Sequence, residues 1–174
     1  MSLQIGLWLA AAVLLFWSVG AYNRLVGLRN AIVRSFVPVD EQFGTRHALL
    51  EQQLDAVGGT LSHAAARVDA LRAAALQADT ARAHAKAHPG APGAIRSLCL
   101  ADEILAEARA RLPVQAVPGI DLADLNARLA LADTALAFAR GQFNAAVLDY
   151  NRAVEQIPTR LIAALFGFGP AGTL

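Results

Sequence analysis

Few side chains in this 174-residue sequence have the type and spacing that chemistry requires. His84 and His88 stand four residues apart, so on a helix they share one face and could chelate a metal ion. No Asp, Glu or Cys lies between them or close by to complete a site, and Pro89 disrupts the helical turn beside them. The pattern favours a solvated helix end, and we predict no bound metal.

Cys99 is the single cysteine, so the chain cannot form an internal disulfide. It lies among apolar residues on a predicted helix, where a free cysteine usually serves as a small buried hydrophobe. Nucleophilic catalysis would need a base and a group to orient it, and the surrounding sequence suggests neither. Asp102 and Glu103 are adjacent, so on a helix their carboxylates point in different directions instead of sharing a substrate.

The glycines at 167, 169 and 172 match the dinucleotide-binding pattern GxGxxG letter for letter. That pattern works only between a strand and a helix, and neither is predicted here. We therefore expect no cofactor and no enzymatic activity.

The dominant feature of the sequence is the uncharged run from Leu3 to Tyr22. It is roughly 20 residues long, enough for a helix to cross a ~30 Å hydrocarbon layer. A cleaved signal peptide and a buried soluble helix are the alternatives. The first four residues carry no Lys or Arg and the run is too long for a signal-peptide core, so a membrane anchor is the preferred interpretation.

Charge around this run predicts its orientation. Arg24, Arg29 and Arg34 follow it closely, and no Lys or Arg precedes it. Basic residues stay on the cytoplasmic side, so the chain after the anchor is expected in the cytoplasm, with the N-terminus outside. The net charge of +1 gives no basic surface of the kind that binds nucleic acid.

Composition indicates an all-α protein. Hydrophobic residues make up 56% of the chain, many of them Ala, whereas aromatic residues make up only 6%. We predict an N-terminal transmembrane helix followed by an antiparallel four-helix bundle. The predicted parts are an anchor over 1–23, the bundle over 24–157, and an apolar segment near the membrane over 158–174.

Apolar residues recur every three or four positions along two long predicted helices, which are joined by shorter ones. The first stripe keeps its phase across Pro38, which predicts a kink instead of a turn. Gly58-Gly59 is either a turn or part of one long helix. Loops are predicted around 88–93 and 114–119, and Asp121 is a predicted N-cap. The two stripes contain Leu25, Ile32, Phe36, Val39, Phe43, Leu50, Leu54 and Val57, then Leu122, Leu125, Leu129, Ala132, Leu136, Ala139, Phe143, Val147, Tyr150, Val154 and Ile157.

An up-and-down bundle returns the last long helix to the membrane. After Pro158 comes an apolar cluster with one basic residue, Arg160, at its edge. This segment either lies in the lipid interface or caps the open end of the bundle core. Both alternatives place it beside the anchor.

Both ends of the chain resemble the LemA family. The opening resemblance lies in Tyr22-Asn23, Leu25-Val26 and Leu28-Arg29-Asn30; the closing one in Ala139-Arg140, Phe143-Asn144, Ala146-Val147, Tyr150-Asn151, Ile157-Pro158, Leu161-Ile162-Ala163 and Phe166-Gly167-Phe168. The Ala-rich middle of the chain departs from the family pattern. The resemblance implies a bacterial single-pass protein of the inner membrane with a helical bundle, in a family that includes membrane-remodelling and organelle-building members.

These features predict a membrane-anchored scaffold or interaction protein, whose partners are the lipid bilayer and either other proteins or further copies of itself. The alternatives are a membrane-shaping protein and an accessory factor of a membrane enzyme or protease complex. The asparagines among the candidates either fix helix register in a packed seam or face solvent. The candidate structural or interaction residues are Tyr22, Asn23, Arg29, Arg140, Asn144, Tyr150, Asn151, Leu161, Phe166 and Phe168.

Overall fold

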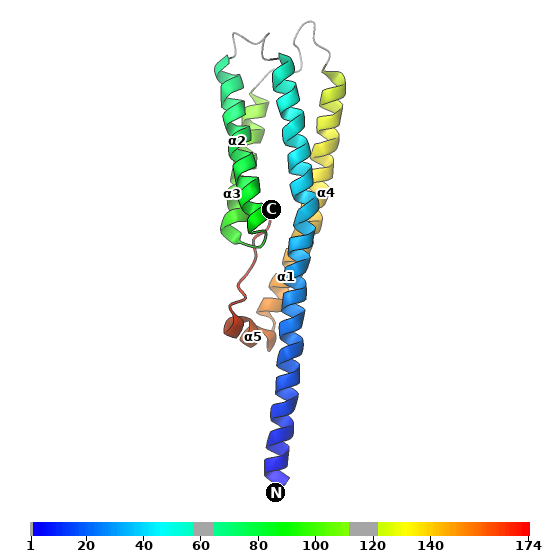
Figure 1. The fold of residues 1–174 in the computed structure, drawn as a ribbon, viewed down its shortest axis with the longest axis vertical. Helices are drawn as coiled ribbons and strands as arrows, with labels where there is room; N and C mark the ends of the chain where they lie inside the picture. The colour runs from blue at the N-terminus through cyan, green and yellow to red at the C-terminus, as the bar shows by residue number, and fades with distance from the viewer. Residues whose placement is uncertain (1, 58–64, 112–121) are drawn as a thin grey trace.

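The computed structural model of the protein describes residues 2–57, 65–111 and 122–174, and in these ranges the chain is all-α, as predicted (Figure 1). The helices are α1 (Ser2–Val57), α2 (Ala65–Ala87), α3 (Pro92–Ala110), α4 (Ala123–Glu155) and α5 (Thr159–Phe166). The predictions for Gly58-Gly59, for the loop at 114–119 and for the Asp121 N-cap fall outside the described residues.

Helix α1 is 56 residues long and runs without interruption through Pro38, so the chain makes no turn there. Its N-terminal part projects beyond the other helices (Figure 1). Large apolar side chains from Ile5 to Val19 are exposed, and burial against the rest of the protein begins at Ala21. By length and composition, α1 is the one described helix able to cross a membrane. The uncharged run and the exposed part of α1 therefore end at nearly the same residue.

The remaining helices surround the C-terminal part of α1 (Figure 1). Helix α4 packs along α1, α3 packs along α2, and α2 joins the two pairs through contacts with α1. Helix α4 runs back toward the exposed part of α1, which confirms the up-and-down order of the predicted bundle.

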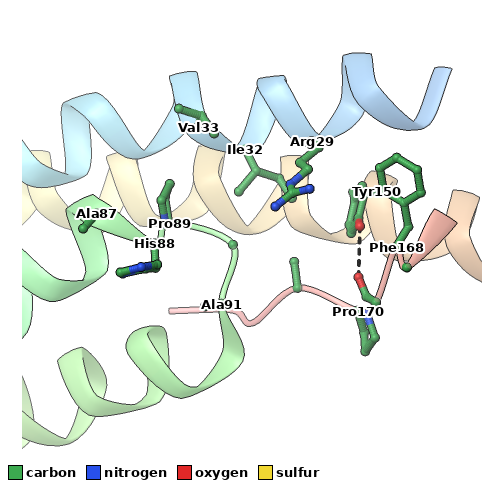
Figure 2. A pocket seen from close by; sticks show the side chains of 14 residues that line it. Arg29, Ile32, Val33, Ala87, His88, Pro89, Ala91, Tyr150, Phe168 and Pro170 are labelled. Atoms are coloured by element: carbon green, nitrogen blue, oxygen red, sulfur yellow. Dashed lines mark hydrogen bonds between the residues drawn. The ribbon is translucent and has the colours of Figure 1, made fainter. Parts of the chain in front are cut away.

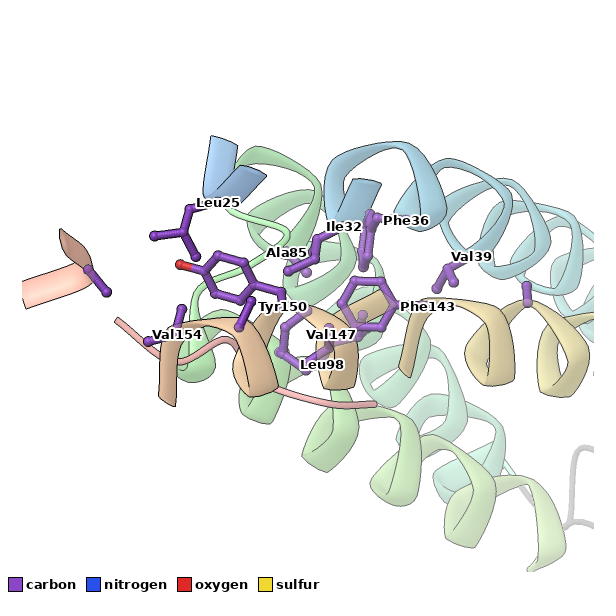
Figure 3. Packing of buried hydrophobic residues seen from close by; sticks show 14 of the residues in the cluster. Leu25, Ile32, Phe36, Val39, Ala85, Leu98, Phe143, Val147, Tyr150 and Val154 are labelled. Carbon is purple, nitrogen blue, oxygen red and sulfur yellow. The ribbon is translucent and has the colours of Figure 1, made fainter. Parts of the chain in front are cut away.

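The core consists of two clusters stacked along the bundle. The cluster nearer the anchor is built on Phe143 and Phe36, whose ring centroids are 5.6 Å apart, and Figure 3 shows their packing with Leu98. The stripe residues from Leu25 to Leu54 and from Leu122 to Val154 fill these clusters, whereas Ile157 follows the end of α4 and is exposed. The second stripe therefore ends at Val154. The side chain of Val57 lies outside the described residues.

The segment after α4 consists of helix α5 and the residues that follow it. Helix α5 lies across the end of the bundle where α1 emerges (Figure 1). We call residues 167–174 the tail. The tail turns away from the exposed part of α1 and ends between α3 and α4, because side chains of α4 bind its backbone.

Candidate functional site

Three aromatic side chains join α5 to α1. The ring centroid of Tyr22 lies 4.9 Å from that of Phe166 and 5.7 Å from that of Phe168. The first ring pair is tilted and the second is edge-to-face, an arrangement that aromatic quadrupoles prefer. Tyr22 is the last residue of the uncharged run, so this cluster holds α5 at the point where the exposed part of α1 meets the bundle.

A glycine then reverses the chain. Gly167 has a φ of 71°, a left-handed conformation that an L side chain would strain, and the Phe168 amide donates to the Ala163 carbonyl at 2.9 Å. This helix cap ends α5 and directs the tail back along the bundle. Gly167, the first glycine of the GxGxxG pattern, therefore provides the left-handed residue that ends α5.

Two asparagines of α4 clamp the tail backbone. The side-chain amide of Asn151 donates to the Ala171 carbonyl at 3.0 Å and accepts from the Ala171 amide at 2.8 Å. Asn144 does the same for Leu174, with distances of 2.7 and 2.8 Å. Each asparagine therefore satisfies both backbone groups of one tail residue, as a neighbouring strand would.

The spacing of this clamp follows from helix and strand geometry. Asn144 and Asn151 are two helical turns apart, ~10.5 Å along α4. Ala171 and Leu174 are three residues apart, ~10 Å in an extended chain. The two repeats match, so an extended tail running antiparallel to α4 meets both asparagines in register. We call Asn144 and Asn151 the asparagine clamp. Because its bonds go to backbone atoms only, the clamp depends on the extended conformation of the tail and not on the tail's side chains.

The opposite side of the tail packs against α3. A Cβ atom on Gly172 would lie 2.8 Å from the Cα of Pro92, so only glycine fits at this position. The thiol of Cys99 lies 3.9 Å from the Thr173 carbonyl. The tail therefore fills the space between α3 and α4 and joins the two helix pairs of the bundle.

A cleft of about 410 Å³ lies beside the tail, between α1 and the turn that joins α2 to α3. Figure 2 shows Arg29, His88, Tyr150 and Phe168 around it. The Tyr150 hydroxyl donates to the Gly169 carbonyl at 2.9 Å. Burial raises the pKa of Tyr150, and the Arg29 charge only partly opposes this. Arg29 has no ion-pair partner among the described residues.

A buried ion-pair layer crosses the bundle above this cleft. Asp102 of α3 is buried and pairs with Arg46 of α1 and with Arg140 of α4, the latter at 2.5 Å. Both guanidinium groups also lie 5.0 Å from the ring centroid of Phe43. The layer fixes the relative height of three helices, because the carboxylate must meet both cations.

A known family model matches residues 35–174, which include the C-terminal part of α1, the helices α2 to α5, the tail and the ion-pair layer. The chain belongs to the LemA family. No match is found among curated proteins or among solved structures. The family match includes the asparagine clamp and α5, whereas Tyr22, Asn23 and Arg29 precede it.

Most of the candidate interaction residues predicted from the sequence of this LemA-family chain take part in contacts around α5 and the tail. Tyr22, Phe166 and Phe168 form one cluster. Asn144 and Asn151 bind the backbone of the tail. Asn23 is exposed and has no hydrogen-bond partner among the described residues. Leu161 is exposed on α5.

Sequence reasoning missed two buried carboxylates of the LemA-family body. Asp102 follows Ile95 and Leu98 at helical spacing on the apolar face of α3, and this placement was the available signal. Asp40 of α1 is also buried and pairs with Arg82 and Lys86 of α2 at 2.9 and 2.7 Å.

The side chains considered for chemistry are His84, His88, Cys99, Asp102 and Glu103. The rings of His84 and His88 are 5.1 Å apart at the exposed end of α2. Within the described ranges, no three His, Cys, Asp or Glu side chains gather closely enough to hold a metal ion. Cys99 is partly buried, and burial raises the pKa of its thiol, which disfavours the nucleophilic thiolate. Glu103 is exposed while its neighbour Asp102 is buried, so the two adjacent carboxylates point in different directions, as predicted.

Proposed function

We propose that this protein is a scaffold without catalytic activity, held in the bacterial cytoplasmic membrane by the N-terminal part of α1 and assembled side by side with further copies of itself. The body lies in the cytoplasm and the N-terminus outside, since Arg24, Arg29 and Arg34 follow the apolar run. Neither a nucleic acid nor a cofactor is part of this function.

One observation carries the proposal: the outward face of α4 is apolar and uncovered. Leu131 and Phe138 are each 70% exposed and stand one heptad apart, and Leu148 is also exposed further along the helix. The positions between them on this face are Thr134, Gly141 and Ala145, which are small and exposed. Such a stripe of large and small residues at heptad spacing is typical of a helix that packs against another helix.

Charged residues in this stretch of α4 turn away from the stripe. Between Arg128 and Asp149, α4 carries only Asp133 and Arg140 as charged residues. Asp133 pairs with Arg109 of α3 at 3.0 Å, and Arg140 pairs with Asp102. A neighbouring helix on the outward face would therefore bury no unpaired charge of this stretch.

The membrane favours a second copy as the partner. Anchored copies share one orientation and one height, so the α4 faces of two neighbours lie at the same level and run parallel. A two-fold axis along the membrane normal would bring Phe138 of each copy against Phe138 of the other. Confinement in the membrane plane also raises the effective concentration of copies.

Disulfide trapping in native membranes tests this proposal. In a Cys99→Ala background, oxidation of the Phe138→Cys variant should give a covalent dimer, whereas the Leu76→Cys variant should stay monomeric. Leu76 is a matched control because it is 68% exposed on α2, away from α4. Equal yields from the two variants, or no dimer from Phe138→Cys, would contradict self-assembly through α4.

A second test uses the chain with its native cysteine. The Phe138→Glu substitution places a charge in the stripe and should lower the dimer fraction after chemical cross-linking in membranes. The Leu76→Glu substitution should leave that fraction unchanged. Loss of the dimer in both variants would indicate a general effect of added charge and would refute a specific α4 interface.

A further inference from the structure

Helix α5 has a buried face and an exposed face, and the exposed face is apolar. Thr159, Ile162 and Ala163 are buried against the bundle. Leu161 and Leu165, four residues apart, are 69% and 75% exposed, and Phe166 is also exposed. No acidic residue lies in α5, and its single charged residue is Arg160. This composition is typical of a helix lying in the interface of a membrane.

The height of α5 matches the end of the uncharged run. Its terminal Phe166 contacts Tyr22, the last residue of that run, with ring centroids 4.9 Å apart. Arg24, the first charged residue of the chain, follows within one turn. The exposed apolar side chains of α1 before Ala21 and those of α5 therefore lie on either side of the Tyr22–Phe166 contact. Tyrosine at such a boundary is typical of the lipid headgroup level.

The direction of α5 also fits a membrane surface. It lies across the lower end of the bundle beside α1, so a bilayer crossed by α1 would run roughly parallel to α5 (Figure 1). Helix α4 precedes α5 by three residues, and the cap at Gly167 and the asparagine clamp hold the chain that follows α5. Both ends of α5 are therefore tied to the bundle.

We infer that α5 is a second membrane contact, an in-plane helix whose Leu161, Leu165 and Phe166 side chains enter the lipid interface. This inference rests on the proposed anchoring of α1. The expected depth is ~5–10 Å, that of amphipathic interfacial helices. A rod held by one helix can tilt freely, whereas a second contact beside it limits the tilt of the body. The exposed faces of α4 in neighbouring copies are then presented at a fixed angle to the membrane.

Depth-dependent fluorescence quenching of the full chain tests the inference. Single cysteines are introduced by Leu165→Cys, Val13→Cys and Leu76→Cys in a Cys99→Ala background and labelled with an environment-sensitive fluorophore. Each variant is reconstituted into vesicles of phosphatidylethanolamine and phosphatidylglycerol. The quenchers are lipids that carry a nitroxide near the headgroup or near the end of the acyl chain.

The Leu165→Cys label should be quenched more by the shallow nitroxide than by the deep one, and the Val13→Cys label more by the deep one. The Leu76→Cys label should be quenched by neither. Quenching at Val13→Cys without quenching at Leu165→Cys would overturn the α5 contact while leaving the anchor intact. Absence of quenching at Val13→Cys would instead overturn the anchor and, with it, the inference. Circular dichroism of each variant checks that the helical fold is retained.

Discussion

Replacing Asn151 with alanine removes both hydrogen bonds that hold Ala171 of the tail to α4. Each such bond contributes a net ~0.5–1.5 kcal/mol, so the docked tail loses ~1–3 kcal/mol, a ~5- to ~150-fold shift toward the released state. The helix itself is not weakened, because alanine has a higher helix propensity than asparagine. Release leaves the tail amides in water, so no buried polar group of the tail stays unpaired.

Hydrogen exchange of the tail measures this shift directly. The Leu174 amide donates to Asn144, which the variant retains, and exchanges only when the tail opens, so its exchange rate should rise by the same factor. The matched control is Asn30→Ala, since Asn30 is exposed on α1 and has no hydrogen-bond partner among the described residues. Equal tail exchange in the Asn151→Ala and Asn30→Ala variants would refute the clamp.

Four further predictions concern the tail, the ion-pair layer and Cys99. The Gly172→Ala substitution should speed tail exchange in the same assay, because its Cβ would meet the Pro92 Cα at 2.8 Å, and an unchanged rate would show that the tail does not pack there. The Asp102→Ala substitution leaves Arg46 and Arg140, both partly buried, without their shared carboxylate and should lower the free energy of unfolding by ~1–3 kcal/mol, whereas Glu103→Ala on the exposed side should change it little. Burial raises the pKa of Cys99, so the folded chain holds the thiol proton more tightly than the unfolded chain does. The stability this contributes is complete below the ordinary cysteine pKa and is lost as pH rises through the raised one; the Cys99→Ala variant should lack this loss in denaturation measured against pH. Alkylation of Cys99 should be slower at neutral pH than that of the exposed cysteine of Leu76→Cys in the Cys99→Ala background.

The apolar stripes predicted the helices of the bundle, because burial of one helical face repeats in the sequence. The same signal predicted that the chain continues as a helix through Pro38, since Phe36, Val39 and Phe43 keep one phase and are all buried. The charge-free run similarly predicted where α1 leaves the bundle. These features are local or periodic, so the sequence alone carries them.

The contacts of the asparagine clamp and of the ion-pair layer are neither local nor periodic in the sequence. Asn144 binds Leu174, 30 residues away, and Arg46 binds Asp102, 56 residues away. Such pairs depend on the rotation and axial offset of packed helices, which the apolar stripes leave undefined. The seven-residue spacing of Asn144 and Asn151 is visible in the sequence, but it does not indicate that their partner is an extended tail.

The central claim is that α1 fastens the bundle to the cytoplasmic face of a membrane, and one measurement tests it most directly. The full chain carrying Cys99→Ala and Leu76→Cys is expressed in bacteria and treated with a membrane-impermeant maleimide, before or after the cells are broken. The protein should remain with the membranes after an alkaline wash and react only in broken cells. Release by the wash, or reaction in intact cells, would contradict the account.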